Sequence, residues 1–584
     1  MRKLLIYLKD YKKESVLGPL FKLLEASFEL IVPLVMAAII DRGIGNQDGA
    51  YVVKMCFVLI ALALIGLTCS ITAQYYAAKA AVGFSTKIRH VLFSHIETLS
   101  FTEMDVVGTS TLITRMTSDI NQVQSGVNLV LRLFLRSPFI VFGAMIMAFT
   151  INVKAALVFV VAIPLLSIVV FGIMIISIPL YRKVQSALDN VLGITRENLT
   201  GTRVIRAFRK EADEMEHFHE SNEFLTRMQL YVGKISALMN PVTYIIINGA
   251  TIVLIYTGAV QVDQGIITQG EVVALVNYMS QILVELIKLA NLIITVTKAI
   301  ACGNRIQSIL ELSPSIVSKP SKQWQSALEE GRKSDEILSF EGVGLSYEKA
   351  GEEALSDLNF TVRRGETIGI IGGTGSGKSS VVHLIPRFYD VTRGEVRING
   401  MNVKDYPVEV LRNMVGIVQQ KAVLFKGTIR ENLMWGKKDA TEEELEEALR
   451  ISQAKEFVDA KEGRLDYEIE QGGKNLSGGQ RQRLTIARAI VKKPEILILD
   501  DSASALDYAT DAKLREAIRE MKNTTVFLVS QRAASLMHAD KILVLDDGNL
   551  VGMGTHEELL KTCEIYREIY ESQFPKQNAA QEGR

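Results

Sequence analysis

The sequence has few cysteines and no excess of charge of either sign. Its four cysteines (Cys56, Cys69, Cys302 and Cys563) lack the spacing of metal ligands, so neither a disulfide framework nor a zinc site is indicated. The 65 Lys and Arg residues balance 65 Asp and Glu residues, which argues against a basic surface for nucleic acid and against an acidic tail. No cleavable signal peptide is apparent at the start.

The apolar residues are unevenly placed along the chain. At 584 residues the chain is too long for one domain, and nearly all of the long apolar runs precede residue 300. Residues 1–13 mix basic and apolar side chains, which predicts a short amphipathic helix on the inner membrane surface.

Six segments have the length and composition of membrane spans. Segments 55–78, 155–180 and 235–262 run for 24 to 28 residues without one charge, and a spanning helix needs about 20 predominantly apolar residues. A core helix of a large soluble protein can explain one such run, but three make that reading improbable. Three weaker candidates, each with charges, complete the set: 15–40, 127–150 and 272–296.

The basic residues predict the orientation of these spans. Segments on one predicted side hold 18 Lys or Arg residues, whereas those on the other side hold three. The first group comprises 1–14, 79–126 and 181–234, and the second comprises 41–54, 151–154 and 263–271. Because basic loops stay in the cytoplasm, the first group and the C-terminus are predicted to be cytoplasmic.

The two long internal connections, 79–126 and 181–234, have apolar residues at helical spacing. They predict transmembrane helices that extend into the cytosol and end in short elbows near 109–118 and 207–215. A pair of solvated loops is the alternative, although structureless segments of this length are uncommon.

Charges within the weaker spans bear on the cargo. Glu25 and Glu29 are four residues apart and share one helix face, as do Arg132 and Arg136. These side chains can line a cargo cavity, or they can lie in the interfacial zone or in a cytoplasmic extension. The sequence leaves both readings open.

The composition changes after the last span. Residues 312–336 carry Pro, Ser and mixed charge, which predicts a linker between two domains. From 337 to 575 short β-rich runs alternate with helical patterns, and 576–584 form a polar tail. The predicted fold is therefore multidomain, with an all-α six-helix transmembrane domain at 1–311 followed by an α/β domain.

A glycine-rich loop, here called the phosphate loop, follows the buried strand 368–371. It comprises Gly372, Gly373, Thr374, Gly375, Ser376, Gly377, Lys378, Ser379 and Ser380. Its spacing is that of a P-loop between a strand and a helix, whose backbone N–H groups surround phosphate. Lys378 would neutralise the phosphate oxygens and Ser379 would offer its hydroxyl to Mg²⁺. Asp500, at the end of another apolar strand, would hold Mg²⁺ through water. ATP and Mg²⁺ are the predicted cofactors.

A third motif points to one family. The signature run comprises Leu476, Ser477, Gly478, Gly479 and Gln480. Together with the phosphate loop, Asp500, and the run of Ser504, Ala505, Leu506 and Asp507, it makes the chain resemble the ABC transporter family, as an exporter half-transporter. The resemblance implies a dimer in which each ATP lies between the phosphate loop of one chain and the signature run of the other. It also implies that Tyr347 stacks on adenine and that Gln420 senses Mg²⁺.

Two positions depart from the family pattern. Asp501 stands where the family has a Glu that orients the attacking water, and Gln531 stands where it has a His against the γ-phosphate. A misplacement of about 1 Å in a catalytic group can cost about 10²-fold in rate, and Gln brings no positive charge. The hypothesis is a degenerate ATP site in one subunit of a heterodimeric multidrug exporter.

The predicted function is ATP-driven export of an amphipathic or hydrophobic substrate across the cytoplasmic membrane. A drug-like compound, a lipid or a peptide would suit, and hydrolysis would occur mainly in the composite site completed by a second half-transporter. A nucleotide-gated regulator or channel-like protein and a homodimeric exporter are the alternatives. A soluble ABC protein needs no charge-free spans, and importers usually carry their two domains on separate chains.

Overall fold

The computed structural model describes residues 1, 3–318, 324–348, 351–502 and 506–574. By its internal contacts the chain forms two compact units. The first comprises 1–97 and 109–312, and the second comprises 98–108 and the described residues from 313 onward. Each unit is described on its own.

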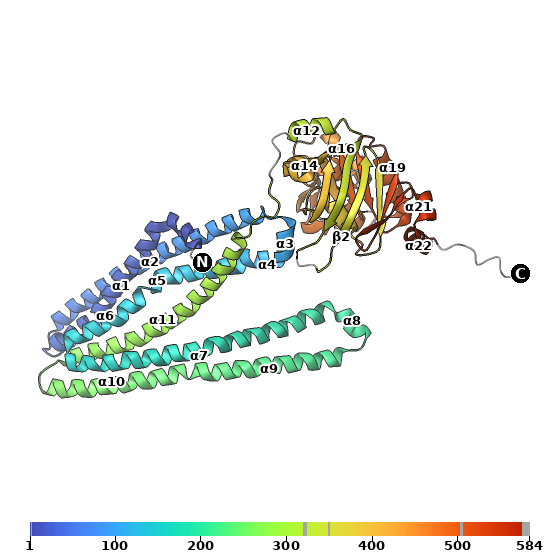
Figure 1. The fold of residues 1–584 in the computed structure, drawn as a ribbon. Helices are drawn as coiled ribbons and strands as arrows, with labels where there is room; N and C mark the ends of the chain where they lie inside the picture. The colour runs from blue at the N-terminus through green and yellow to red at the C-terminus, as the bar shows by residue number, and fades with distance from the viewer. Residues whose placement is uncertain (2, 319–323, 349–350, 503–505, 575–584) are drawn as a thin grey trace. The chain divides into compact units, whose positions relative to one another are not determined.

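The first unit is entirely helical (Figure 1). In the described residues, six helices are long and apolar enough to cross a membrane, and each contains one of the six predicted spans. The elements are η1 (Leu4–Tyr11), α1 (Lys12–Ala38), η2 (Ile39–Ile44), α2 (Gly49–Ile96), α4 (Thr109–Thr114), η3 (Arg115–Asp119), α5 (Ile120–Leu133), α6 (Arg136–Ile151), α7 (Val153–Thr200), α8 (Thr202–Ala207), α9 (Glu211–Ala237), α10 (Met239–Asp263) and α11 (Gln269–Leu310).

Side-chain caps start the helices at the predicted external turns. Asp48 accepts a hydrogen bond from the backbone of α2, and Asn152 does the same for α7. Thr268 and Glu271 form a capping box at the start of α11. Because each cap satisfies backbone N–H groups that a helix leaves unpaired, these turns can be short.

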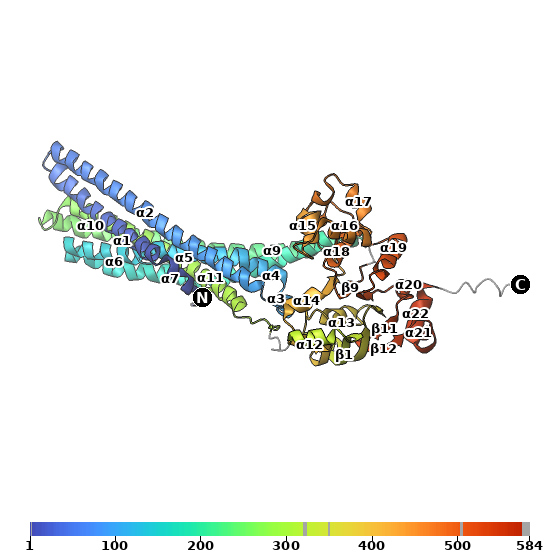
Figure 2. The same ribbon diagram turned by 90° about the horizontal axis from the view of Figure 1, so that it is seen from above.

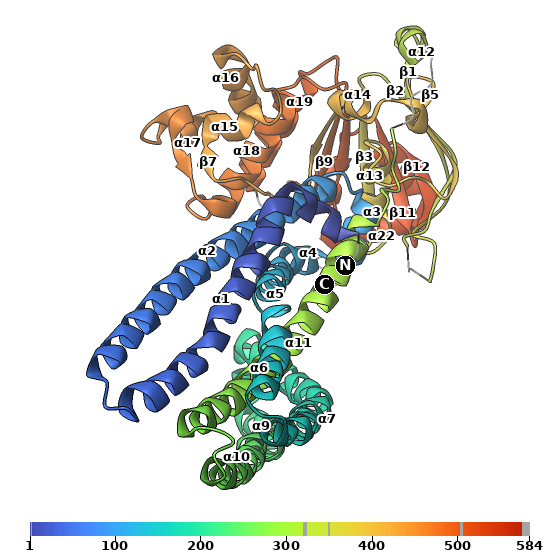
Figure 3. The ribbon, with the colours of Figure 1, turned by 90° about the vertical axis from the view of Figure 1, so that its left-hand side faces the viewer.

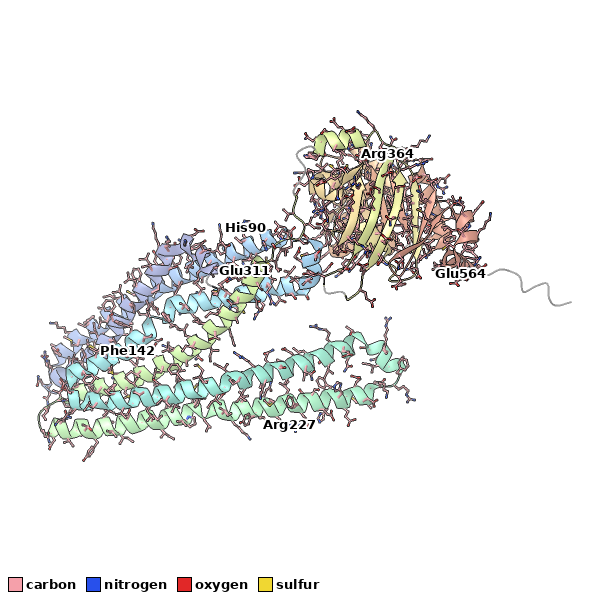
Figure 4. All side chains as sticks on the ribbon, viewed as in Figure 1. His90, Phe142, Arg227, Glu311, Arg364 and Glu564 are labelled. Carbon is pink, nitrogen blue, oxygen red and sulfur yellow. The ribbon has the colours of Figure 1, made fainter. Side chains whose placement is uncertain are left out.

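The helices pack in two groups, as the views from above and from one end show (Figures 2 and 3). One group packs α1 against α2 and α11 against α5 and α6, and the other packs α7 against α9 and α10. Many large apolar side chains remain exposed, among them Val161, Ile168 and Phe142, which is labelled in Figure 4. An apolar exterior of this extent is typical of a membrane-facing surface.

The first predicted elbow is wrong in position, whereas the second overlaps the observed turn. The first turn is the short helix α3 (Phe101–Val107), closed by Gly108 at φ 78°, and the predicted range 109–118 is instead helical in α4 and η3. The second turn lies around α8, and α9 begins at Glu211, inside the predicted range 207–215. The apolar spacing continues through both regions, so the turns depend on caps and glycines that the periodicity does not detect.

The second unit is an α/β domain with three sheets. Its strands are β1 (Glu336–Leu345), β2 (Leu355–Arg363), β3 (Thr367–Gly372), β4 (Arg393–Ile398), β5 (Met401–Asn402), β6 (Val415–Val418), β7 (Gly427–Thr428), β8 (Glu468–Ile469), β9 (Ile496–Asp500), β10 (Thr525–Val529), β11 (Lys541–Asp546) and β12 (Asn549–Gly554). Its helices are α3, α12 (Trp324–Gly331), α13 (Lys378–Leu384), η4 (Val403–Asp405), α14 (Val408–Met414), α15 (Ile429–Met434), α16 (Glu442–Ile451), α17 (Lys455–Asp459), η5 (Arg464–Asp466), η6 (Gln471–Gly473), α18 (Gly478–Ile490), α19 (Tyr508–Arg519), α20 (Ala533–Leu536), α21 (His556–Thr562) and α22 (Glu564–Gln573).

The largest sheet positions the candidate site. Its order is β12-β11-β3-β10-β9-β6, with β12 antiparallel and the other five strands parallel. The strands β3, β10 and β9 are neighbours, so their carboxyl ends meet at one edge. Ligands of parallel α/β sheets bind at this edge. The fold class predicted from the sequence is thus confirmed.

The predicted domain boundaries stay predictions, but the structure adds detail within the linker 312–336. There α12 packs Leu328 into the core of the second unit, and a Cβ on Gly331 would lie 1.8 Å from the carbonyl oxygen of Asn399. This helix therefore packs as part of the α/β unit. The predicted tail, 576–584, lies outside the described residues.

Candidate nucleotide-binding site

The phosphate loop joins the end of β3 to the start of α13. Its backbone is left-handed at Gly375, with φ 88°, and at Gly377, with φ 90°. A Cβ on Gly377 would lie 2.6 Å from Leu355 Cδ2 and 2.9 Å from the carbonyl oxygen of Ala354. Both the dihedral angle and the contact therefore require glycine here.

Lys378 lies over the loop that precedes it. Its ammonium donates to the carbonyl oxygen of Gly372 at 3.0 Å and to Ser376 Oγ at 3.3 Å. Burial lowers the pKa of Lys378, whereas the nearby carboxylates of Asp500 and Asp501 act in the opposite direction. The structure thus places a cation where a phosphate would neutralise it.

A hydroxyl and a carboxylate stand together beside the loop. Ser379 Oγ donates to Asp500 Oδ1 at 3.1 Å, and Asp500 is only 3% exposed at the end of β9. Burial raises the pKa of Asp500. Hard oxygen donors in this arrangement fit Mg²⁺, which takes one or two protein ligands together with phosphate oxygens and water.

The predicted binding residues surround one cavity of about 330 Å³. Those that line it are Tyr347, Thr374, Gly375, Gly377, Lys378, Ser379, Ser380, Gln420, Asp500, Asp501 and Gln531. Gly372 ends β3, and Ser376 is buried behind the loop. The sheet edge thus gathers residues from distant parts of the sequence, although their individual roles stay predictions.

Asp501 has a constrained backbone. Its φ is 45°, and its N–H donates to the carbonyl oxygen of Val529 at 3.0 Å. Gln420 Nε2 donates to Asp501 Oδ2 at 3.4 Å, which is longer than a strong hydrogen bond. Burial and the neighbouring Asp500 raise the pKa of Asp501. The carboxylate therefore faces the cavity without a tight side-chain bond from Gln420.

Gln531 is held by a residue that the sequence did not single out. Gln573, at the end of α22, donates through Nε2 to the carbonyl oxygen of Gln531 at 2.7 Å. The side-chain oxygen of Gln573 accepts from the N–H of Ala533 at 2.8 Å. This amide bridges both sides of the turn after β10 and fixes where the side chain of Gln531 begins.

Tyr347 belongs to an aromatic cluster at one end of the cavity. Its hydroxyl lies 2.9 Å from Ser380 Oγ, and its ring meets Tyr389 edge to face at 5.0 Å. Tyr389 donates in turn to Asp105 Oδ2 of α3 at 2.6 Å, and Phe101 of α3 packs on Phe388 at 4.5 Å. The short helix α3 and the proposed adenine-stacking residue therefore share one cluster.

The signature run starts α18 and does not line the cavity. Ser477 and Gln480 form a capping box, with each side chain accepting from the other's backbone N–H. Leu476 is buried, whereas Ser477 and Gly478 are exposed. The first turn of the 13-residue helix α18 is thus open on the surface, where its N–H groups favour an anion.

Part of the run that follows β9 can be placed. Leu506 is buried, and Asp507 caps α19 by accepting from the N–H of Thr510 at 2.9 Å. Asp507 therefore has a structural role within the chain. Ser504 and Ala505 lie outside the described residues.

Both halves of the chain match families of known proteins. Residues 15–286 match the family described as "ABC transporter transmembrane region", and residues 355–504 match the one described as "ABC transporter". The chain is 36% identical over 582 residues to the "Uncharacterized ABC transporter ATP-binding protein YfiB" of Bacillus subtilis, covering 99% of this chain and 100% of that one. It is 32% identical to the "Putative multidrug export ATP-binding/permease protein YgaD" of Bacillus subtilis, covering 98% of each.

A solved structure shares the fold. It is titled "Structure of a bacterial Atm1-family ABC exporter with ATP bound", with a TM-score of 0.78 at 21% identity, and it covers 97% of this chain and 99% of that one. The chain is thus an ATP-hydrolysing membrane transporter of the half-transporter layout. It belongs to the ABC transporter family. It is a multi-pass plasma-membrane protein whose ATP-binding domain is cytoplasmic.

Proposed function

We propose that this chain is the degenerate-site subunit of a heterodimeric ATP-driven exporter. The observation that carries the proposal is that Asp501 and Gln531 line the same cavity as Lys378, Ser379 and Asp500. The loop, Lys378, Ser379 and Asp500 are suited to hold ATP and Mg²⁺. These residues therefore support ATP binding, whereas Asp501 and Gln531 do not support rapid ATP hydrolysis.

The chemistry of the two replacements gives the reason. The Asp501 side chain is one methylene shorter than Glu, so its carboxylate reaches less far into the cavity that it lines. Gln531 has a neutral amide, so it can form a hydrogen bond but cannot place a positive charge against the developing charge of the transition state. Both changes weaken the step that positions and activates the attacking water.

The surface of α18 supports the role of a partner. Ser477 is exposed, and the capping box with Gln480 fixes the first turn of the helix. On the proposed function, this turn contacts the γ-phosphate of ATP held by the phosphate loop of the second chain. The composite site formed there would carry out most of the hydrolysis, provided that the partner supplies the Glu and the His that this chain lacks.

The substrate is proposed to be amphipathic or hydrophobic. The helical unit contains a cavity of about 480 Å³ whose wall combines apolar side chains such as Val32 and Met36 with charged ones such as Glu29 and Lys288. Drug-sized ligands bind in cavities of about 300–1,000 Å³. A nucleotide-gated regulator would not require such a cavity within its membrane helices.

The test begins with the tagged full-length chain isolated from its own membranes. We expect it to be accompanied by a second half-transporter with Glu and His at the positions equivalent to Asp501 and Gln531 and with an altered signature run. The complex should hydrolyse ATP about 10³-fold faster than the chain alone and should move an amphipathic dye against its gradient in proteoliposomes. Rapid turnover by the chain alone would support a homodimer, and ATP-dependent opening without uphill transport would support a regulator.

A further inference from the structure

Four charged residues from three different spans meet inside the helical unit. Arg136, at the start of α6, donates through Nη1 to Glu285 of α11 and through Nη2 to Glu29 of α1, each at 2.6 Å. Ser137 donates to Glu285 at 2.8 Å, and so does Lys288. The sequence left open whether Glu29 and Arg136 face a cavity or lie in an interfacial zone, and the structure brings them together.

The depth of this cluster follows from the helix lengths. Glu29 lies 15 residues before Ile44, Arg136 lies 15 before Ile151, and Glu285 lies 16 after Gln269, where the long helices have their external ends. At 1.5 Å per residue, all three lie about 23 Å from those ends. The hydrocarbon core is about 30 Å thick. The cluster therefore lies past the midplane, in the cytoplasmic half of the membrane, and not in the outer interfacial zone.

The inner part of the cluster is mostly paired, although Arg136 Nε is buried without a hydrogen-bond partner among the described residues. The side chains of Arg136 and Glu285 are 7% and 3% exposed, and the Glu285 carboxylate accepts from three donors. The outer members differ, because the side chains of Glu29 and Lys288 are 40% and 42% exposed and both line the 480 Å³ cavity. One negative and one positive group are thus presented to whatever enters, and the four charges sum to zero.

The cavity has a charged end and a less polar end. Glu29, Glu285 and Lys288 lie toward the cytoplasm, whereas Val32, Pro33 and Met36 follow Glu29 along α1 toward the outside. Across from them α11 contributes Asn277, Ser280 and Gln281. Among the described residues, Gln281 Oε1 is buried without a hydrogen-bond partner. The cavity is therefore charged toward the cytoplasm and polar but uncharged on the α11 side farther out, so the charged head of an inner-leaflet amphiphile would lie at the cytoplasmic end.

We propose that this cavity selects zwitterionic amphiphiles, whose heads carry one ammonium and one phosphate or carboxylate group. The ammonium would pair with Glu29 and the anionic group with Lys288. A singly charged head would satisfy one wall residue and be repelled by the other in a partly desolvated space. This inference rests on the proposed function, because it names the class of cargo for that exporter.

The test measures binding without ATP. Spin-labelled 16-carbon amphiphiles with a zwitterionic, an anionic and a cationic head (lysophosphatidylcholine, lysophosphatidylglycerol and an alkyl trimethylammonium) are added to the full-length chain in nanodiscs. Electron spin resonance then gives the immobilised fraction. An alkyl betaine distinguishes carboxylate from phosphate as the anionic group, and free phosphocholine shows whether the tail is needed. We expect the zwitterion to bind about tenfold tighter than either singly charged amphiphile.

Three variants and a matched control test whether the charged residues select the head group or only stabilise the helical unit. Glu29→Gln should shift the preference to the anionic head and Lys288→Met to the cationic head, each by about tenfold, and the double variant should bind all heads alike. Lys79→Met is the control, because Lys79 is 49% exposed, pairs with Glu14 at 2.9 Å and does not line this cavity. Unfolding midpoints recorded by far-ultraviolet circular dichroism, which follows the helical unit that carries these residues, and size-exclusion profiles show whether each variant keeps its fold.

The outcomes separate this inference from the proposed function. Equal binding of all heads by the unmodified chain, or variants that behave like Lys79→Met, would overturn the selectivity and leave a purely structural role for the cluster. Export without head-group preference would also count against this inference alone. Selective binding in a complex that transports nothing would count against the proposed exporter and not against the site.

Discussion

Replacing Asp501 by Glu and Gln531 by His together should raise the ATPase rate of the purified chain. The longer side chain lets the carboxylate reach the attacking water, and the imidazole supplies a donor that can carry positive charge. The remaining binding residues are already on the cavity. Two copies of the repaired chain should therefore form two competent sites, since each also carries a complete signature run.

The size of the effect follows from the geometry. One methylene moves the carboxylate by about 1.5 Å, and a misplacement of about 1 Å can cost about 10²-fold in rate. Loss of one donor to a developing charge costs about 10²–10³-fold. Asp501→Glu alone should raise the rate about 10²-fold, and the double variant should reach about 10³-fold or more.

The assay is steady-state ATP hydrolysis by the full-length chain in nanodiscs, with two controls. A left-handed backbone disfavours Glu more than Asp. Asp547, at the turn between β11 and β12, has a φ of 43°, close to the 45° of Asp501. Asp547→Glu therefore tests the backbone cost of this change at a residue that does not line the cavity. Adding Lys378→Ala to the double variant should abolish the gained activity, which would assign that activity to the chain's own phosphate loop.

Two results of this assay would contradict the prediction. If the double variant binds ATP as tightly as the unmodified chain but hydrolyses it no faster, Asp501 and Gln531 do not limit catalysis. If the unmodified chain already hydrolyses ATP as fast as the double variant, its own site is competent and the heterodimer is unnecessary.

Three further predictions concern other parts of the second unit. In the assembled heterodimer, Gly479→Asp should abolish nearly all ATPase activity by placing a carboxylate against the partner's γ-phosphate, whereas Asp501→Asn should spare most of it; equal losses would refute the asymmetry. Tyr389→Phe removes the hydrogen bond to Asp105 of α3, so substrate stimulation of ATPase should fall while basal ATPase stays within about twofold, since such a bond contributes about 1 kcal/mol. Burial lowers the pKa of Lys492 from 10.5 to about 8, so the folded domain binds fewer protons than the unfolded chain between these values and its stability should rise with pH there. Lys492→Met should remove that rise. At pH 7 it should also remove the cost of about 3 kcal/mol of burying the charged Lys492 ammonium. Both effects are measured by tryptophan-detected unfolding.

The sequence predicts the fold, and it predicts that the motif residues meet, for a local reason. The phosphate loop is nine consecutive residues, and Asp500 ends a strand of continuous apolar residues. Because parallel strands end at one sheet edge, these local patterns are sufficient to place Lys378 and Asp500 together. The six spans are equally local, since each depends only on the length and apolarity of one segment.

The contacts between distant segments could not be predicted in the same way. Nothing near Gln531 indicates that Gln573 bridges its turn, and nothing near Tyr389 indicates its bond to Asp105 of α3. The position of the first elbow was wrong for a related reason, because periodicity continues where a cap and Gly108 end the helix. In the membrane unit, i to i+4 spacing paired Glu25 with Glu29, whereas the structure pairs Glu29 with Arg136 of another span.

A slow ATP site can still contribute to transport on the proposed function. A ligand that binds only the closed dimer stabilises that state by RT ln(1 + [L]/Kd), or about 2.7 kcal/mol when its concentration is 100 times its Kd. ATP retained beside Asp501 would supply this stabilisation in every cycle. Hydrolysis of the second ATP, at the partner's phosphate loop, would remove the stabilisation that this second ATP gives and allow the dimer to open. Weakening retention with Lys378→Ala should therefore raise the ATP concentration needed for half-maximal turnover of the heterodimer, without removing the catalytic groups of the active site. If that variant instead lowers the maximal rate at saturating ATP as much as Gly479→Asp does, the retained nucleotide is being hydrolysed and the site is not slow.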